Sequence, residues 1–146
     1  MDYRKEYEKW LASPALSEDE RRELKALEGD DKEIKARFYG PLEFGTAGLR
    51  GTMYTGLHNM NRHVIRWATQ GFANVIRAEG GEAMKKGVAV CMDCRNHSAE
   101  FARETACVMA ANGIHVRLFE SLRPTPELSF AVREYGCQAG VNVTAS

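Results

Sequence analysis

The sequence predicts an α/β fold: a three-layer α/β/α domain with a mostly parallel, mixed sheet, preceded by a helical N-terminal arm. Three observations support this class. Short apolar runs alternate with helical periodicities from about residue 60 onward, the connections between them are short, and half of the first 40 residues are charged. Strands that alternate with helices over short connections favour right-handed crossovers and an open sheet covered on both faces. A chain of 146 residues can bury one such core.

The N-terminal arm, residues 1–40, differs from the rest of the chain in composition. It holds 9 Lys or Arg and 11 Asp or Glu, whereas the remaining 106 residues hold 11 and 9. Apolar residues recur in the arm at helical spacing, and Ser17 with Glu20 forms a capping-box signature. We therefore predict two or three short amphipathic helices in the arm, followed by a domain over residues 41–146. Such a charge run is typical of a solvated arm, and a partner-binding surface is the alternative.

A glycine-rich segment opens the predicted domain. Gly45, Gly48 and Gly51 lie within seven positions between apolar residues, from about Pro41 to Met53. This spacing is typical of a tight loop and not of a helix.

The next predicted elements are a helix and a buried strand. Asn61 can cap a helix whose apolar face runs through residues 64–76, and Gly80 with Gly81 can end it. The run from residue 87 to 92 is continuously apolar, which predicts a parallel strand covered on both faces.

A second helix and strand complete a β-α-β unit. Ser98 can cap a helix that ends at Asn112 and Gly113, and residues 114–119 predict the following strand. Because ligands of open α/β sheets bind beyond the carboxyl ends of strands, the segment that begins at Asp93 is a candidate site.

The last predicted helix and strand lead to the C-terminal serine. Thr125 as N-cap with Pro126 at the first helical position predicts a helix that Gly136 ends. Residues 139–143 predict a strand, and Thr144-Ala145-Ser146 follows it as a second candidate site at a strand end.

Composition narrows the classes of partner. The 20 basic and 20 acidic residues cancel, so we expect neither nucleic acid nor a membrane surface to bind the chain. No run approaches the length of about 18 apolar residues that spans a bilayer, and we expect a cytoplasmic protein. The four cysteines are expected as free thiols, because a chain of this size needs no disulfide framework.

Four segments carry a resemblance as a set: 44–51, 93–98 with Phe101, 124–128 and 139–146. Together they resemble domain I, the N-terminal domain, of the alpha-D-phosphohexomutase family, which includes phosphoglucomutases and phosphomannomutases. The charged arm and the segments 42–51, 59–61 and 69–71 look most similar to the branch of bacterial α-phosphoglucomutases and animal phosphopentomutase-like enzymes.

The resemblance implies that Ser146 is the catalytic serine that carries a phosphoryl group. The family exchanges this group with a hexose phosphate, as in the conversion of glucose 1-phosphate to glucose 6-phosphate through a bisphosphate intermediate. The implied enzyme is an intramolecular phosphotransferase that uses Mg²⁺, held in part by the phosphate on Ser146, with glucose 1,6-bisphosphate as phosphorylating intermediate. Phosphopentomutase and phosphomannomutase activities are the alternatives.

The resemblance also assigns roles around the serine. Arg50 is implied as a catalytic and substrate-binding residue, because a guanidinium is always charged and can grip phosphate with two donors. A supporting loop role is implied for Thr46, Gly48, Gly51, Asp93, Arg95 and Thr144. Asp93 and Arg95 are expected to orient their loop through hydrogen bonds.

The implied partners are a small-molecule sugar phosphate and the remaining domains of the same enzyme. The family pattern continues beyond the serine, so we expect these 146 residues alone not to turn over substrate, and we expect Ser146 to be mobile. Asn142 stands where relatives carry an apolar residue. Because an unsatisfied buried amide costs about 1–3 kcal/mol, we expect either a wet face or a hydrogen-bond partner there.

Two other interpretations compete with the mutase. Cys91 and Cys94 form a C-x-x-C that His97 could extend to a zinc or redox site, although a closed zinc site needs four ligands and no second pair is nearby. A non-catalytic, receiver-like domain could accept phosphate on Asp93. That module needs an acidic cluster near its start and a later strand-end lysine, which the sequence lacks.

Overall fold

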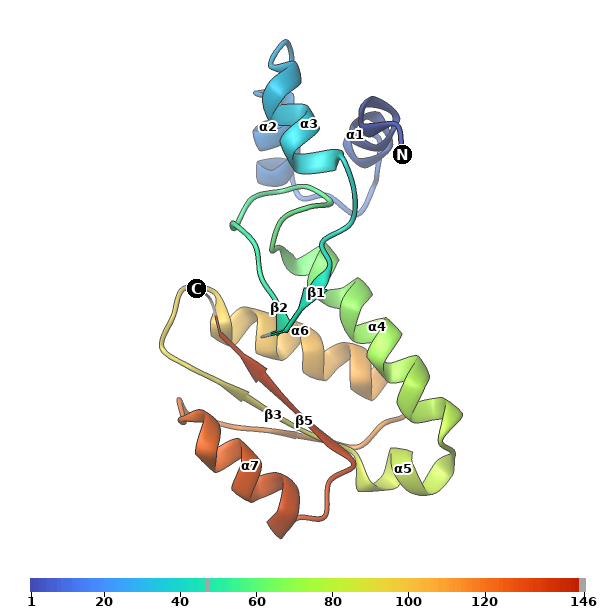
Figure 1. The fold of residues 1–146 in the computed structure, drawn as a ribbon, viewed down its shortest axis with the longest axis vertical. Helices are drawn as coiled ribbons and strands as arrows, with labels where there is room; N and C mark the ends of the chain where they lie inside the picture. Colours follow the sequence, from blue (N-terminus) through green and yellow to red (C-terminus); the bar gives the residue numbers. More distant parts are fainter. Residues whose placement is uncertain (47, 145–146) are drawn as a thin grey trace. The chain divides into compact units, whose positions relative to one another are not determined.

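The chain divides into two compact units between Val64 and Ile65. The computed structural model describes residues 1–46 and 48–144. The first unit contains the whole charged arm and the glycine-rich loop, and the second contains the parallel sheet (Figure 1). The predicted domain boundary at residue 40 rests on composition alone and stays a prediction.

Three short helices form the arm, as predicted from its periodicity. They are α1 (Tyr3–Leu11), α2 (Glu18–Lys25) and α3 (Asp31–Phe38). The predicted capping box is confirmed: Ser17 accepts a hydrogen bond from the Glu20 amide, and the Glu20 carboxylate accepts one from the Ser17 amide at 2.7 Å. The Ser17 and Glu20 amides, two donors at the start of α2 that lack a partner within the helix, are thereby satisfied.

The first unit has its own hydrophobic core. Phe38 and Leu24 are fully buried in it, and the Tyr7 ring meets the Phe38 ring edge-on at 5.6 Å between centroids. The Tyr7 hydroxyl donates to the Leu24 carbonyl at 2.9 Å. The buried members of this cluster are Tyr7, Leu16, Leu24, Leu27, Ile34, Phe38 and Leu57.

The glycine-rich segment contains a small hairpin. Strands β1 (Phe44–Gly45) and β2 (Gly48–Leu49) pair antiparallel, with Phe44 opposite Leu49. The prediction of a tight loop holds, but two-residue strands lie below what hydrophobic periodicity can resolve.

Two helices precede the sheet, and only one was predicted. Helix α4 (Arg62–Ala78) is capped by Asn61, whose Oδ1 accepts the amides of His63 and Val64 at 3.1 Å each. Helix α5 (Gly81–Lys86) follows directly, where the sequence predicted only a stop.

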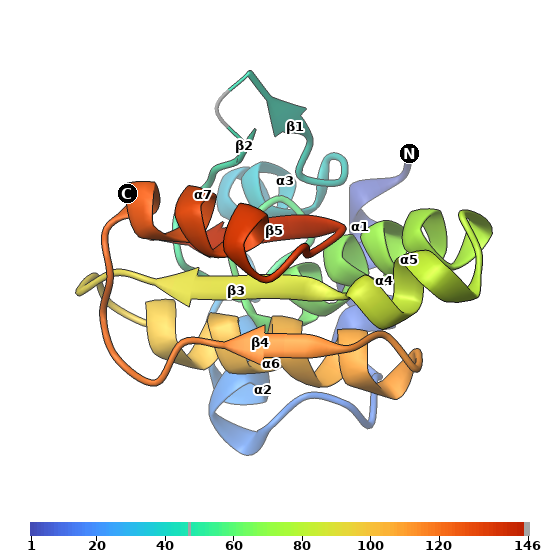
Figure 2. The ribbon, with the colours of Figure 1, turned by 90° about the horizontal axis from the view of Figure 1, so that it is seen from below.

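The second unit is built on a parallel sheet with the order β4-β3-β5 (Figure 2). Its strands are β3 (Val88–Met92), β4 (Val116–Leu118) and β5 (Ala139–Val143). Strand β3 lies in the centre and its first four residues are fully buried, which explains its continuous apolar run.

Helices α6 (Ser98–Ala111) and α7 (Thr125–Glu134) cover opposite faces of this sheet (Figures 1 and 2). Ala89 and Cys91 pack with Leu128 of α7 in one cluster. The three-layer α/β/α class is thereby confirmed. None of the described helices is long and apolar enough to cross a bilayer.

The start of α6 differs from the prediction by one residue. His97 is the N-cap, with a left-handed backbone at φ 61°, and makes no side-chain cap. Ser98 lies inside the helix, and its Oγ donates to Asp93 Oδ1 at 2.9 Å. The predicted N-cap role of Ser98 is wrong, because its hydroxyl donates to the Asp93 carboxylate five residues earlier and His97 takes the cap position.

The start of α7 differs in the same way. Pro124 is the N-cap and Thr125 the first helical residue. The Thr125 hydroxyl accepts a hydrogen bond from the Asn142 side-chain amide at 2.8 Å, and Asn142 Oδ1 accepts one from Cys91 Sγ at 3.2 Å. Of the two expectations for Asn142, a bonding partner is the one observed.

Candidate functional site

Asp93 joins the ends of two strands and the start of a helix. Its backbone amide donates to the Val143 carbonyl at 3.3 Å. Its carboxylate accepts hydrogen bonds from Ser98 Oγ at 2.9 Å, from the Arg95 amide at 3.1 Å and from the Thr144 hydroxyl. We call these residues, Asp93, Arg95, Ser98 and Thr144, the Asp93 junction.

The register of the sheet brings this junction about. Met92 of β3 lies opposite Val143 of β5, so the two parallel strands end at the same edge. Asp93 and Thr144 are each the first residue beyond their strand, and they meet although 51 positions separate them. The structure therefore brings together the two strand-end segments that the sequence singled out.

The donors around Asp93 hold its carboxylate in the charged form. Burial raises the pKa of Asp93, but the hydrogen bonds from Thr144, the Arg95 amide and Ser98, with the nearby charge of Arg95, outweigh it and lower the pKa below its usual value. The Asp93 side chain is 29% exposed, and the Arg95 guanidinium lies 3.5 Å from it. The junction is thus a fixed negative charge surrounded mainly by neutral donors.

Ser146 lies outside the described residues, so the prediction that it is mobile stays a prediction. Thr144, two residues before it, is described and bound to Asp93.

The loop that carries Arg50, from Gly45 to Gly51 and called here the Arg50 loop, belongs to the first unit. Gly48 has φ 98°, a region that favours glycine. A side chain at Gly51 would begin 3.2 Å from both methyl groups of Leu42, which leaves little room for one. Arg50 between them is exposed, as is Thr46 in the turn. Within residues 1–46 and 48–144, Arg50 makes no hydrogen bond or ion pair.

Two asparagines shape the segment that follows, and sequence reasoning assigned their side chains no role beyond the cap. Asn59 donates to Thr52 Oγ1 at 2.9 Å. Asn61 donates to the carbonyls of Tyr54 at 3.0 Å and Gly56 at 2.8 Å. Asn side chains often bond nearby backbone in loops, so their position between a glycine-rich loop and a helix was the available signal.

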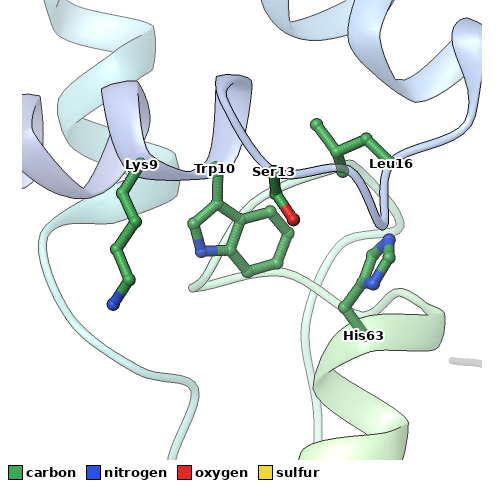
Figure 3. A pocket seen from close by; sticks show the side chains of 5 residues that line it. All are labelled: Lys9, Trp10, Ser13, Leu16 and His63. Carbon is green, nitrogen blue, oxygen red and sulfur yellow. The ribbon is translucent and has the colours of Figure 1, made fainter.

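A hollow of about 380 Å³ lies elsewhere in the first unit (Figure 3). The Trp10 and His63 rings approach edge-on at 5.6 Å, and His63 Nε2 lies 3.1 Å from Glu20 Oε1. None of the predicted site residues lines it. The lining residues are Lys9, Trp10, Ser13, Leu16 and His63.

The cysteine pair differs in environment between its two members. Cys91 is fully buried and Cys94 is exposed, and both are free thiols. Burial, and then the charge of Asp93, raises the pKa of Cys91. Among the described residues, no three His, Cys, Asp or Glu lie together as a metal site. The zinc or redox interpretation therefore gains no support from these residues.

A family model described as "Phosphoglucomutase/phosphomannomutase, alpha/beta/alpha domain I" matches residues 41–146. The match covers both the Arg50 loop and the Asp93 junction. No solved structure matches the chain significantly.

Several curated relatives are similar over most of the chain. A phosphopentomutase of Pongo abelii is 37% identical over 125 residues, which is 82% of this chain and 20% of the relative. A phosphoglucomutase of Staphylococcus saprophyticus is 38% identical over 116 residues, 80% of this chain and 20% of the relative. A phosphomannomutase of Mycoplasma pneumoniae is 32% identical over 143 residues, 97% of this chain and 26% of the relative. The chain thus spans about a fifth to a quarter of the length of these relatives.

Proposed function

Because the chain belongs to the phosphoglucomutase/phosphomannomutase family and carries its domain I, we propose that it acts in a phosphosugar mutase whose Ser146 carries the transferable phosphoryl group. The proposed reaction converts glucose 1-phosphate to glucose 6-phosphate through a bisphosphate. Glucose 1,6-bisphosphate would load the serine initially.

The observation that carries this proposal is the bond between Asp93 and Thr144. It ties the end of β5, two residues before Ser146, to the sheet edge at which open α/β sheets bind ligands. A nucleophile gains rate when its backbone is held in a reactive geometry. The charged Asp93 carboxylate supplies such an anchor for the segment that leads to Ser146.

The proposed chemistry balances without a co-reactant. A free hydroxyl oxygen of the sugar phosphate forms a bond to phosphorus, the bond from phosphorus to Ser146 Oγ breaks, and the proton of the sugar hydroxyl ends on Ser146 Oγ. After the bisphosphate turns over, Ser146 Oγ takes the other phosphoryl group in the same way. The enzyme therefore ends the cycle phosphorylated, as it began.

Arg50 is proposed to bind the phosphoryl oxygens. Its guanidinium is permanently charged and offers paired donors that match phosphate. Charge on the transferring group is spread over its oxygens, so cations positioned beside it lower the barrier. The exposure of Arg50 and its lack of a partner in residues 1–46 and 48–144 support this role.

The described residues do not by themselves fit a Mg²⁺ site. They hold no cluster of three candidate ligands, and Asp93 is already occupied by three donors. Mg²⁺ takes oxygen ligands, often from substrate phosphates, so ligands such as a phosphate on Ser146 would be needed.

The test is to assay the complete protein with glucose 1-phosphate, mannose 1-phosphate and ribose 1-phosphate, with the bisphosphate added, and to map the phosphorylated residue by mass spectrometry. We expect the highest kcat/KM with glucose 1-phosphate and phosphate on Ser146. Preference for ribose or mannose phosphate would make the protein a phosphopentomutase or a phosphomannomutase. Absence of activity with all three, together with an unphosphorylated Ser146, would overturn the proposal.

The chemical stability of the phosphate in the same sample distinguishes phosphorylation of Ser146 from phosphorylation of Asp93. A phosphoserine ester survives acid, whereas an aspartyl phosphate is cleaved by hydroxylamine. We expect an acid-stable ester, because the Asp93 carboxylate already serves as an acceptor in the junction. A hydroxylamine-labile phosphate would favour the receiver-like alternative.

A further inference from the structure

One carboxylate of the arm bonds directly to the segment that follows Arg50. Glu23 of α2 accepts hydrogen bonds from the Thr55 amide at 3.1 Å and from the Thr55 hydroxyl at 2.5 Å. Its Oε1 also accepts from Arg37 Nη1 of α3 at 2.5 Å. The Glu23 carboxylate therefore connects α2 both to α3, through Arg37, and to the loop residue Thr55.

Arg37 stabilises this contact between the arm and the loop. Its side chain is 9% exposed and lies between Glu23 and Glu33, the latter at 2.9 Å. The guanidinium lies over the Tyr54 ring at 4.3 Å. The Arg37 carbonyl accepts the His58 amide at 2.9 Å. Because a buried cation must stay paired, this arrangement resists displacement of the loop.

The contact with Thr55 can be followed to Arg50. Thr52, two residues after Arg50, accepts the Met60 amide at 2.9 Å on its carbonyl and the Asn59 side chain on its hydroxyl. The segment 52–60 is thus closed on itself, and the Glu23 carboxylate anchors it from outside at Thr55. Moving this anchor would move the end of the loop that carries Arg50.

We infer that Glu23 is a positioning residue, through which the charged arm sets the conformation of the Arg50 loop for phosphoryl transfer. The inference rests on the function proposed above for Arg50. It gives the arm a role in the reaction beyond that of a solvated helical extension.

The experiment compares Glu23→Ala with Glu33→Ala in the complete protein. Both variants remove one carboxylate from Arg37, but only Glu23 contacts Thr55, so Glu33→Ala is the matched control. We expect kcat/KM for the preferred sugar phosphate to fall about 10- to 100-fold in Glu23→Ala, a loss typical of a displaced binding group, and less than roughly threefold in Glu33→Ala. Amide hydrogen exchange in residues 48–58 should rise only in Glu23→Ala.

Two further variants test whether Glu23 acts through its contact with Thr55 and through Arg50. Thr55→Val replaces the hydroxyl with a methyl group of similar size, leaves the amide bond to Glu23 in place, and should reproduce part of the loss. In an Arg50→Ala background, Glu23→Ala should cost no further activity, because the group that it positions is already gone. A merely structural role of Glu23 would lower activity equally in both backgrounds.

The outcomes separate this inference from the proposed function. Active wild-type protein with equal losses in Glu23→Ala and Glu33→Ala, or an undiminished effect of Glu23→Ala beside Arg50→Ala, would overturn the inference alone. A wild-type protein without mutase activity would overturn the proposed function, and with it the positioning role of Glu23.

Discussion

Each of the two compact units contains a charged side chain at which several segments meet, but the two are stabilised differently. In the first unit the Arg37 guanidinium is almost wholly buried and lies between two carboxylates. In the second, the Asp93 carboxylate is partly exposed and accepts two hydroxyls and a backbone amide. The first arrangement depends on opposite charge and the second mainly on neutral donors, so substitution and pH should affect them differently.

The largest effect is expected at the buried cation. Arg37→Ala should lower the free energy of unfolding by about 3 kcal/mol, because it removes a buried, paired guanidinium and the packing of its stem, and leaves two carboxylates close together. Urea unfolding of the purified protein measures this loss. The control is Arg66→Ala, which also breaks a pair at 2.6 Å, with Glu104, but at 46% exposure of the arginine side chain. It should cost about 1 kcal/mol or less. Equal losses of stability in Arg37→Ala and Arg66→Ala would contradict the expectation that the buried pair contributes more than the exposed one.

A smaller effect is expected at the neutral donors of the Asp93 junction. Asp93→Asn should lower the free energy of unfolding by about 2 kcal/mol, because it replaces one of the two accepting oxygens with an NH2 group. Thr144 on one oxygen, or Ser98 and the Arg95 amide on the other, would then lose their acceptor. The same unfolding experiment applies. Asp31→Asn is the control, since Asp31 also accepts several donors but is 53% exposed, and it should change stability by no more than about 0.5 kcal/mol. A negligible effect at Asp93 would mean that the junction is not an anchor.

The smallest expected effect is the pH dependence of the stability difference between the wild type and Asp93→Asn. The pKa of Asp93 is lowered in the folded protein, so its contribution to stability is present above the unfolded value of about 3.9 and is lost as the pH falls through the folded value. The stability advantage of the wild type over Asp93→Asn should therefore be constant from pH 7 to about pH 5 and shrink below about pH 4. Unfolding curves over this range measure it. An advantage that grew on acidification would contradict the direction of the pKa shift.

Most helices and strands could be predicted from local patterns. The capping box at Ser17 and the cap at Asn61 were found because both contacts lie within a few residues of one another. The strand at Val88–Met92 was found because burial on both faces requires an unbroken apolar run.

Two errors concern hydroxyls that bond outside the first turn of their own helix. Ser98 and Thr125 have the residue type of an N-cap, yet the Ser98 hydroxyl bonds to Asp93 five residues earlier and the Thr125 hydroxyl to Asn142 of β5, and each is the first residue of its helix. Helix α5 was missed because its six residues carry too little periodicity to stand out. The hairpin at Gly45 and Gly48 was missed for the same reason of length.

The sequence by itself determined the family, the α/β class and the order of the longer elements, since these depend on short motifs and on the period of hydrophobicity. Only the tertiary structure decided that Asp93 meets Thr144 and that Glu23 meets Thr55, contacts that join positions 51 and 32 residues apart. The reason is physical: sheet register and helix packing choose which of several chemically equivalent donors reaches a given carboxylate, and no local pattern records that choice.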